Sequence, residues 1–300
     1  MLWIPITIAA AFLQNLRSAL QKALKGRLST TGAAYSRFVY ALPLALLYLL
    51  VVSQMTGAAT PAVSGRFLIY CLLGSLSQIL FTVVLLWMFS FRSFAVGTTF
   101  SKLEIILIAI LGAVLLGDTL GASGVAAVAL GGLGAAVLSL RQTRLTPAGL
   151  IRGLGEKATL IGLLSAALLG ASVVFFRGAT LALGDDDFIM RAAFTLAVAL
   201  TMQTAIMGAW FLAFDRAELA RVFREWRRAA PAGVAGMACS ACWFTAFALQ
   251  NAAYVRALGQ IELIFTFLAT VFVFREPVAR SEIAGVVLIA AAILVLLLGG

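Results

Sequence analysis

Long hydrophobic stretches, each about as long as a membrane-spanning helix, follow one another along the whole chain and are separated by short polar breaks. A helix needs about 20 mostly apolar residues to cross the hydrocarbon of a bilayer. The runs are continuous and rich in Leu, Ala and Gly rather than alternating, which favours helices over transmembrane strands. The pattern therefore predicts an all-α polytopic membrane protein with ten spans, near residues 3–22, 33–53, 67–90, 94–116, 121–140, 158–183, 188–214, 231–251, 254–274 and 282–299.

Composition supports a membrane location and argues against a nucleic-acid partner. Of the 300 residues, 63% are hydrophobic and 11% are charged, whereas a soluble domain has about 45–50% apolar and about 25% charged residues. The formal net charge is +10, but most basic residues flank the predicted spans, where anionic lipid headgroups explain them. The chain has no histidine, and its three cysteines lie inside predicted helices. We therefore expect the lipid bilayer as a partner, and no nucleic acid, metal site, cofactor or disulfide framework.

The basic residues also predict an orientation in the cell membrane. The loops after the first, fifth and seventh predicted spans share one side of the membrane and hold most of the loop lysines and arginines. Cytoplasmic loops carry an excess of such residues. This count places both termini outside.

Two of the predicted spans carry the same pattern of acidic residues. Glu104, in "SKLEIILIAILGAVLLGD", and Glu262, in "GQIELIFTFLATVFVFRE", lie 158 residues apart, and Asp118 and Glu276 follow them by fourteen residues each. Matched spacing of this kind indicates a duplicated unit.

Basic residues repeat at nearly the same offset. Lys22 and Arg177 lie 155 residues apart, and Arg37 and Arg191 lie 154 apart, across the junctions that join the first two helices of each copy. The chain is therefore predicted to contain a first five-helix repeat over residues 1–141, a linker over 142–157 and a second five-helix repeat over 158–300. Because five is odd, the second repeat must enter the membrane upside down. Inverted repeats are the architecture of many secondary transporters, whose substrate site lies near the bilayer midplane.

These paired landmarks resemble the drug/metabolite transporter superfamily, and specifically its EamA-like ten-helix members. Such proteins typically carry a basic residue late in the first helix of each repeat, an arginine opening the second helix, and an acidic residue ending the fourth. The matching residues are Lys22, Arg37 and Asp118 (in "LLGD"), then Arg177, Arg191 and Glu276 (in "VFRE"). The chain departs from the family in lacking the proline that often stands near Glu104 and Glu262. Relatives are also usually drawn with both termini in the cytoplasm, opposite to the charge count.

Charged side chains inside the predicted spans are the candidate functional residues. An ionised group at mid-bilayer costs at least about 2.5–3.5 kcal/mol on insertion scales, so it should face protein or water. We predict a central cavity for substrate binding or coupling that contains Glu104, Glu262, Lys102, Arg37, Arg191, Gln260, Trp87 and Trp243. Three alternatives stay open: interhelical hydrogen bonds for the glutamates, snorkelling for the arginines, and an interfacial belt for the tryptophans.

Four further charges lie near helix ends and are predicted to act there or at a gate: Lys22, Arg177, Asp118 and Glu276. The two acids end helices where the helix dipole disfavours negative charge, which suggests a cap for the next helix or a gate. The run from Asp185 to Asp187 could suggest a magnesium motif, but no second acidic cluster accompanies it, so a helix start is favoured.

Together these features predict a secondary transporter, not an enzyme, that works by alternating access. The resemblance implies export of a small metabolite, an amino-acid-like compound or a xenobiotic. A flippase for a lipid-linked or phosphorylated headgroup is the first alternative, and an intramembrane enzyme is the weaker one. Coupling to a proton or another ion, and assembly as a homodimer, stay open.

Overall fold

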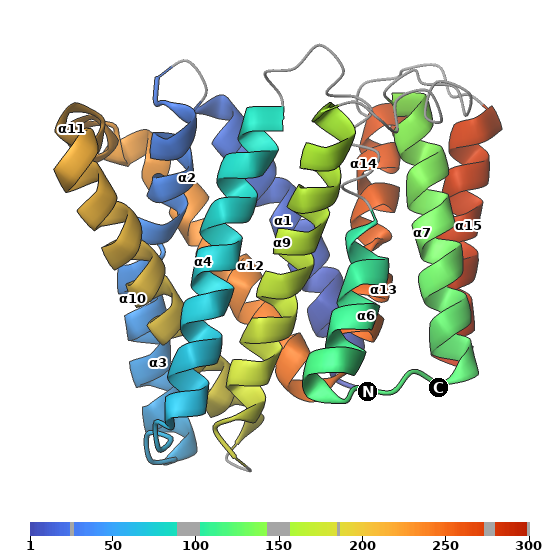
Figure 1. The fold of residues 1–300 in the computed structure, drawn as a ribbon, viewed down its shortest axis with the longest axis horizontal. Helices are drawn as coiled ribbons and strands as arrows, with labels where there is room; N and C mark the ends of the chain where they lie inside the picture. The colour runs from blue at the N-terminus through green and yellow to red at the C-terminus, as the bar shows by residue number, and fades with distance from the viewer. Residues whose placement is uncertain (25–26, 89–102, 143–156, 185–186, 273–279, 299–300) are drawn as a thin grey trace. The chain divides into compact units, whose positions relative to one another are not determined.

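The computed structural model is built of α-helices over the part of the chain that it describes, residues 1–24, 27–88, 103–142, 157–184, 187–272 and 280–298 (Figure 1). This confirms the predicted all-α class. Five helical segments are long and apolar enough to cross a membrane by length and composition: Thr30–Thr56, Gly65–Val84, Thr159–Leu181, Phe188–Phe214 and Trp226–Leu249. Three shorter apolar helices accompany them, at Glu104–Leu116, Ala122–Leu138 and Glu282–Leu298.

Helix contacts divide the chain into two compact units, and each unit takes helices from both halves of the sequence. The first unit comprises residues 1–79 and 175–250, and the second comprises residues 80–174 and 251–300. The helices of the first unit are α1 (Trp3–Ala23), α2 (Thr30–Val39), α3 (Leu42–Thr56), α10 (Phe188–Phe214), α11 (Arg216–Arg224) and α12 (Trp226–Leu249). Those of the second unit are α6 (Glu104–Leu116), α7 (Ala122–Gln142), α13 (Ala252–Gly259), α14 (Ile261–Phe272) and α15 (Arg280–Leu298). Two helices contribute residues to both units, α4 (Gly65–Met88) and α9 (Lys157–Leu181).

The predicted spans near 33–53 and 254–274 are each interrupted in the structure. In the first, α2 gives way to α3 at Tyr40, where Pro43 stands in the first turn of α3 and fixes the backbone at a helix start. In the second, α13 gives way to α14 at Gln260. The sequence analysis also left the segment after Phe214 as a loop, whereas the structure forms α11 there.

Several helix ends are fixed by residues whose chemistry suits the position. The Oδ1 atom of Asp187 accepts hydrogen bonds from the backbone N–H groups of Ile189 and Met190, which confirms a helix start at this end of the acidic run. Helix α6 ends at Gly117, whose φ of 70° lies in the left-handed region that glycine adopts without strain. These ends set the bounds of α10 and α6.

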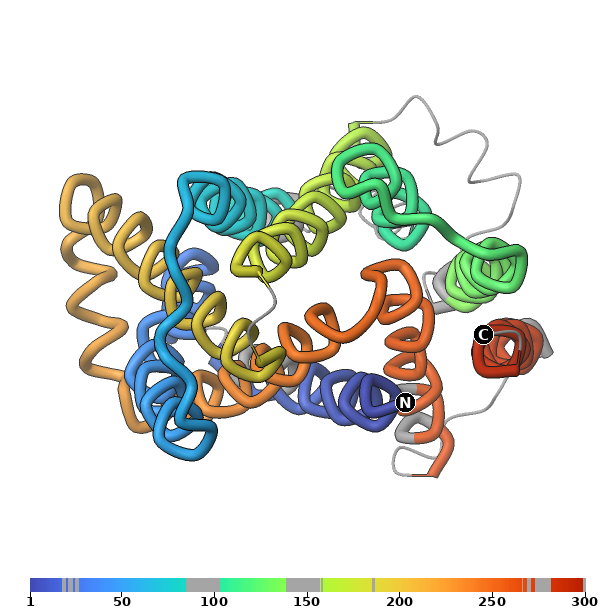
Figure 2. The backbone as a smooth tube through the Cα atoms, turned by 90° about the horizontal axis from the view of Figure 1, so that it is seen from below, coloured from blue at the N-terminus to red at the C-terminus, as the bar shows by residue number. Residues whose placement is uncertain are grey.

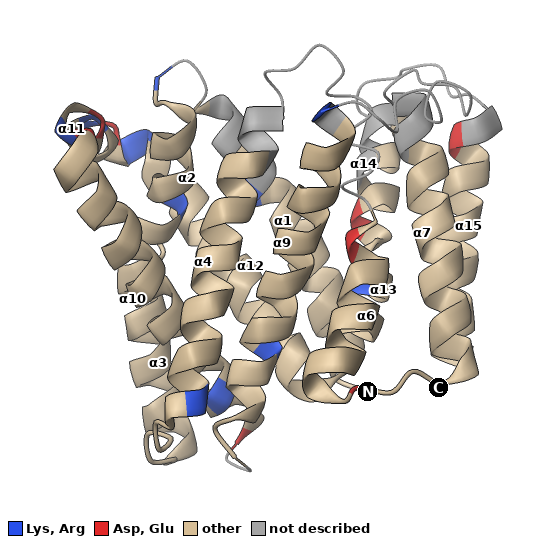
Figure 3. Cartoon of the chain, viewed as in Figure 1, with Lys and Arg blue, Asp and Glu red and all other residues tan. Residues whose placement is uncertain are grey.

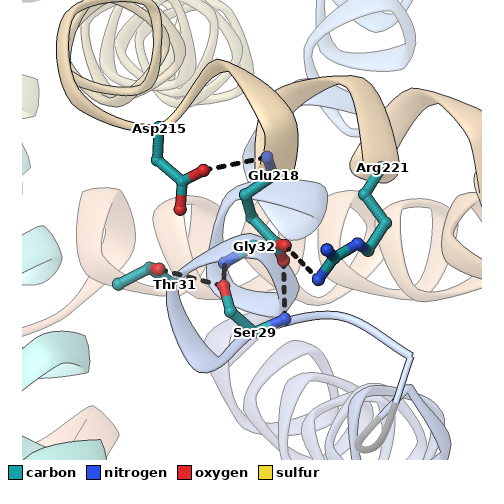
Figure 4. Close-up of polar contacts among 6 residues, drawn as sticks. All are labelled: Ser29, Thr31, Gly32, Asp215, Glu218 and Arg221. Carbon is teal, nitrogen blue, oxygen red and sulfur yellow. Dashed lines mark hydrogen bonds and ion pairs between the residues drawn. The ribbon is translucent and has the colours of Figure 1, made fainter.

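A buried carboxylate in the first unit joins α11 to the start of α2 (Figure 4). Glu218 is 3% exposed, and its Oε1 atom accepts the backbone N–H of Ser29, the N-cap residue of α2. Its Oε2 atom accepts a hydrogen bond from Arg221 at 2.8 Å. Ser29 in turn accepts the N–H of Gly32 through its Oγ atom at 3.0 Å. The amphipathic helix α11 is thereby held against the end of a span.

The core of the first unit combines aromatic rings with many small and aliphatic side chains, and α10 contributes several of its residues. Helix α10 packs against α2, α3 and α12. Buried rings meet between helices, as where Tyr35 and Phe211 have centroids 5.3 Å apart and Phe176 and Phe244 have centroids 5.0 Å apart. Polar groups inside this core are bonded across helices, since the side-chain amide of Gln203 donates to Gln78 at 2.7 Å.

In the second unit, α7 and α15 lie side by side because small residues let their backbones approach (Figures 1 and 2). A Cβ atom placed on Gly134 would lie 2.8 Å from Cγ1 of Ile289 and 2.9 Å from the carbonyl oxygen of Gly285. No side chain fits at that distance without moving the helices.

Charged residues gather mostly at the ends of helices and around α11 (Figure 3). The middle turns of α4 and α10 carry none, as the sequence of each helix also shows. The few charges that lie inside spans are therefore the residues that need a structural explanation.

Candidate functional site

The structure describes eight of the twelve predicted site residues and divides them between the two units. Arg37, Arg177, Arg191 and Trp243 belong to the first unit, and Glu104, Asp118, Gln260 and Glu262 belong to the second. The remaining four fall outside what is described: Lys102 and Glu276 as residues, and Lys22 and Trp87 as side chains.

Arg37 lies beside a second arginine that the site prediction did not include. Arg17 projects from α1 and Arg37 from α2, and both reach Gly236 on α12, where a Cβ atom would lie 3.5 Å from Cδ of Arg17 and 3.5 Å from Cγ of Arg37. The two side chains are partly buried, and their charges are close enough to act on one another. The Arg37 guanidinium also lies 5.1 Å from the ring centroid of Phe38. Both arginine side chains therefore pack against α12 at Gly236 at ordinary van der Waals distances.

Trp243 lies in the same contact between α1 and α12. Its indole N–H donates to Oε1 of Gln14 at 3.0 Å, and its ring stacks on Phe247 with centroids 5.7 Å apart and planes 18° apart. The tryptophan is 7% exposed. It is therefore buried between helices of the first unit, which does not fit the alternative of a tryptophan in an exposed interfacial belt.

Arg177 and Arg191 bind backbone carbonyl groups. Arg177, near the end of α9, donates to the carbonyl oxygens of Phe247 and Gln250 at the end of α12. Arg191 donates through Nη1 to the carbonyl of Gly184 at 2.7 Å, which closes the turn before α10. Cations at such positions satisfy carbonyls that a helix end leaves unpaired. Both residues support helix ends in this structure, and their predicted roles in a cavity or gate stay predictions.

In the second unit, Glu104 forms an ion pair with Arg256. Glu104 begins α6, Arg256 projects from α13, and Nη2 of Arg256 donates to Oε1 of Glu104. The side chains are only 17% and 10% exposed, respectively. The contact is the interhelical bond that had been left open as the alternative for Glu104.

Gln260 lies one turn after Arg256 and faces α7. Its Oε1 atom is buried without a hydrogen bond in the described part of the chain, and it would lie 3.1 Å from a Cβ atom on Gly131. Glu262 stands in the first turn of α14 and is partly buried. Asp118 donates its backbone N–H to the carbonyl of Gly112 at 3.1 Å, in the turn that ends α6. Polar groups of α6, α7, α13 and α14 thus occur within one unit.

An apolar groove of about 530 Å³ follows α1 and α12 in the first unit. Its lining is almost entirely hydrocarbon, with Arg227 as its charged lining residue, and includes Leu13, Leu16, Pro231 and Val234. None of the predicted site residues lines it. Its chemistry suits acyl chains rather than a polar solute.

Within the described ranges, no three His, Cys, Asp or Glu side chains are grouped so that they could hold a metal ion. The two arginines that the site prediction missed, Arg17 and Arg256, share one signal in the sequence. Each is a charge near or within an apolar span.

Comparison with protein families supports the resemblance stated from the paired landmarks. Residues 156–298 match the model of the EamA-like transporter family. The chain carries an EamA-like transporter domain. This family is part of the drug/metabolite transporter superfamily, so the predicted resemblance is confirmed, and together with the apolar helices it indicates a multi-pass membrane transporter of this type. Members of the family are generally not enzymes.

Comparison with solved structures finds the same fold over nearly the whole chain. A crystal structure of a protein with 16% sequence identity aligns with a TM-score of 0.70, over 99% of this chain and 97% of the other. At that identity the likeness shows the fold alone. Among curated proteins, none matches the chain.

Proposed function

We propose that the chain is a secondary transporter in which two inverted five-helix repeats move a small solute across the membrane by alternating access. The family match supports a transporter of the drug/metabolite type. The repeat architecture draws its support from the contact between α7 and α15.

In that contact, two pairs of residues are exchanged by the 158-residue offset found in the sequence. Gly131 approaches Ala292, and Gly134 approaches Ile289. Adding 158 to 131 gives 289, and subtracting 158 from 292 gives 134, so the first pair maps onto the second. A contact that maps onto itself when its two partners are exchanged is what a local twofold axis produces. Since the higher number on α7 meets the lower on α15, the helices also run antiparallel, as inverted copies require.

The bounds of three helix pairs agree with the offsets of 158 and 155 residues found in the sequence. Adding 158 to the bounds of α7, 122 and 142, gives 280 and 300, against Arg280–Leu298 for α15. For α6, the bounds 104 and 116 become 262 and 274, against Ile261–Phe272 for α14. Adding the offset of 155 to the bounds of α1, 3 and 23, gives 158 and 178, within Lys157–Leu181 for α9.

The solute on this proposal is a small metabolite, an amino-acid-like compound or a xenobiotic, as the family resemblance implies. Export, the orientation of the termini, coupling to a proton through Glu104 or Glu262, and a homodimer all remain proposals. No described feature favours the flippase alternative.

Counterflow in proteoliposomes tests the proposal directly. Vesicles containing the purified protein would be preloaded with a high concentration of one solute and presented with a trace of the same labelled solute, over a panel of amino acids, organic acids, phosphate esters and cationic dyes. A carrier gives a transient accumulation of label that saturates with concentration and is absent from protein-free vesicles. Uptake that is linear in concentration for every solute, or that matches protein-free vesicles, would contradict a carrier.

Proton coupling requires a second measurement on any solute that is transported. The double variant Glu104→Gln, Glu262→Gln should lose the stimulation of uptake by a pH gradient while keeping counterflow. If the double variant responds to the gradient as the unaltered protein does, neither glutamate carries the coupled proton.

A further inference from the structure

Arg17 and Arg37 have no anionic partner among the described residues of the first unit. Among the residues that the structure describes, neither guanidinium makes a hydrogen bond or an ion pair, and the Nε atom of Arg17 is buried without an acceptor. Arg37 makes a cation–π contact with the ring of Phe38. Two positively charged side chains therefore lie near one another in a partly buried place. An unpaired charge in such a place costs free energy.

The chain itself has little with which to neutralise them. The first acidic residue in the sequence is Glu104, so residues 1–79 of the first unit contain none. The acids described in the rest of that unit are engaged elsewhere: Asp187 caps α10, Asp215 caps α11, Glu218 holds Ser29 and Arg221, and Glu225 pairs with Arg228. The unit carries two cations inside its helical part and no acid assigned to them.

We propose that Arg17 and Arg37 form a binding site for one oxyanion, a carboxylate or a phosphate group, carried by a solute or by a lipid headgroup. A guanidinium presents its N–H donors in a planar fork that matches the two oxygens of either group. Two forks from different helices, α1 and α2, can hold one anion from two directions, and both side chains pack beside Gly236 on α12. A neutral solute gains nothing from this arrangement.

The assignment of the anion to a transported solute rests on the proposed function, whereas its binding to the two arginines does not. Binding is therefore tested on the purified full-length protein, and transport is tested separately. Inorganic phosphate and acetate serve as probes, with chloride at the same ionic strength as the reference, because general screening affects all three alike.

The variants are Arg17→Gln, Arg37→Gln and the control Arg224→Gln. Arg224 is an exposed residue in the last turn of α11, so its replacement removes one positive charge without altering the proposed site. Phosphate or acetate should raise the thermal unfolding temperature of the unaltered protein and of Arg224→Gln in a saturable way. In either site variant the apparent affinity should fall about ten- to a hundredfold, since charge-assisted hydrogen bonds are lost.

A purely structural role for the arginines predicts a different result. Without any added anion, each site variant should unfold at the same temperature as the unaltered protein or above it, because one of two like charges has been removed. If Arg17→Gln and Arg37→Gln are both less stable without anion and respond to phosphate as Arg224→Gln does, the proposal is wrong. Equal loss of the phosphate response in all three variants would also overturn it, since the effect would then follow net charge alone.

The lipid composition of the nanodisc distinguishes the two possible sources of the anion, a lipid headgroup and a soluble solute. Protein in nanodiscs of phosphatidylcholine is compared with protein in nanodiscs that also contain phosphatidylglycerol. Competition of phosphatidylglycerol with phosphate, present in Arg224→Gln and absent in the two site variants, supports the site and assigns a lipid headgroup to it. Phosphate binding that is independent of the lipid supports the site and assigns a soluble anion. Counterflow then decides transport: a failure there with binding intact removes the proposed function and leaves the anion site standing.

Discussion

Gly32 should tolerate no side chain for as long as Glu218 is in place. A Cβ atom added at Gly32 would overlap with Oε1 of Glu218 and would lie 3.0 Å from its Cδ atom. Glu218 can move only by giving up the backbone N–H of Ser29 and the guanidinium of Arg221. Gly32→Ala should therefore disturb the start of α2 although alanine is the better helix former.

The change in the free energy of unfolding follows from the bonds that are lost and the helix propensity that is gained. The bond from Ser29 to a buried carboxylate is worth about 1.5–3 kcal/mol, and the pair with the exposed Arg221 adds about 0–1 kcal/mol. Replacing glycine by alanine in a helix returns about 1 kcal/mol. We expect Gly32→Ala to lower the free energy of unfolding by about 1–3 kcal/mol and Glu218→Ala by about 2–4 kcal/mol.

The decisive result is the double variant. With Glu218→Ala already present the overlap is gone, so adding Gly32→Ala should raise the free energy of unfolding by about 1 kcal/mol instead of lowering it. Equilibrium unfolding in mixed micelles with a rising fraction of sodium dodecyl sulfate, followed by tryptophan fluorescence, measures all four proteins. If Gly32→Ala is equally harmful in both backgrounds, Glu218 does not occupy the space beside Gly32 and the described contact is wrong.

Three further predictions use the same unfolding measurement. Glu104→Gln and Arg256→Gln should each destabilise by about 2–5 kcal/mol because the remaining charge is left buried, and the double variant should lose less than the sum; additive losses would contradict the ion pair. Gly134→Val should cost about 1–3 kcal/mol by forcing α7 and α15 apart, and an unchanged stability would contradict their close approach. A hydrogen bond from Arg228 holds the pKa of the Glu225 carboxyl below its ordinary value, so its stabilisation is present at neutral pH and lost as the pH falls through that lowered pKa. Glu225→Gln should reduce the loss of stability in acid, and an identical acid profile would refute this.

Several helices could be predicted from the sequence because their ends carry local signals. The span predicted at 188–214 has the same bounds as α10, since Asp187 caps its start and the polar Asp215 stands at its end. By contrast, no drop in hydrophobicity marks the change from α2 to α3, so the prediction joined them. Helix α11 had a usable signal that was overlooked: Asp215 is followed three residues later by Glu218, the spacing of a capping box.

The candidate site could be predicted only in part, because charge inside a span shows that a partner is needed without saying which one. Glu104 was predicted from its place in an apolar span and from its repeat at Glu262, but its partner Arg256 is 152 residues away and was not among the predicted site residues. Arg17 was not among the predicted site residues, because its approach to Arg37 depends on how α1, α2 and α12 pack. The offset of 158 residues could be read from the sequence. Coordinates were needed to find that the contact between α7 and α15 maps onto itself when its two partners are exchanged by this offset.

The two units treat charge inside their helices in different ways, and this difference connects the inferences above. In the second unit, Glu104 is neutralised by Arg256 from the same unit, so that pair is complete without a ligand. In the first unit, Arg17 and Arg37 both lie beside Gly236, and none of the described acids pairs with either. An anion that binds there removes a repulsion as well as making new bonds, so its binding energy is linked to the stability of the first unit. A carrier needs such a link, because a solute can shift an equilibrium between conformations only by its different affinity for them.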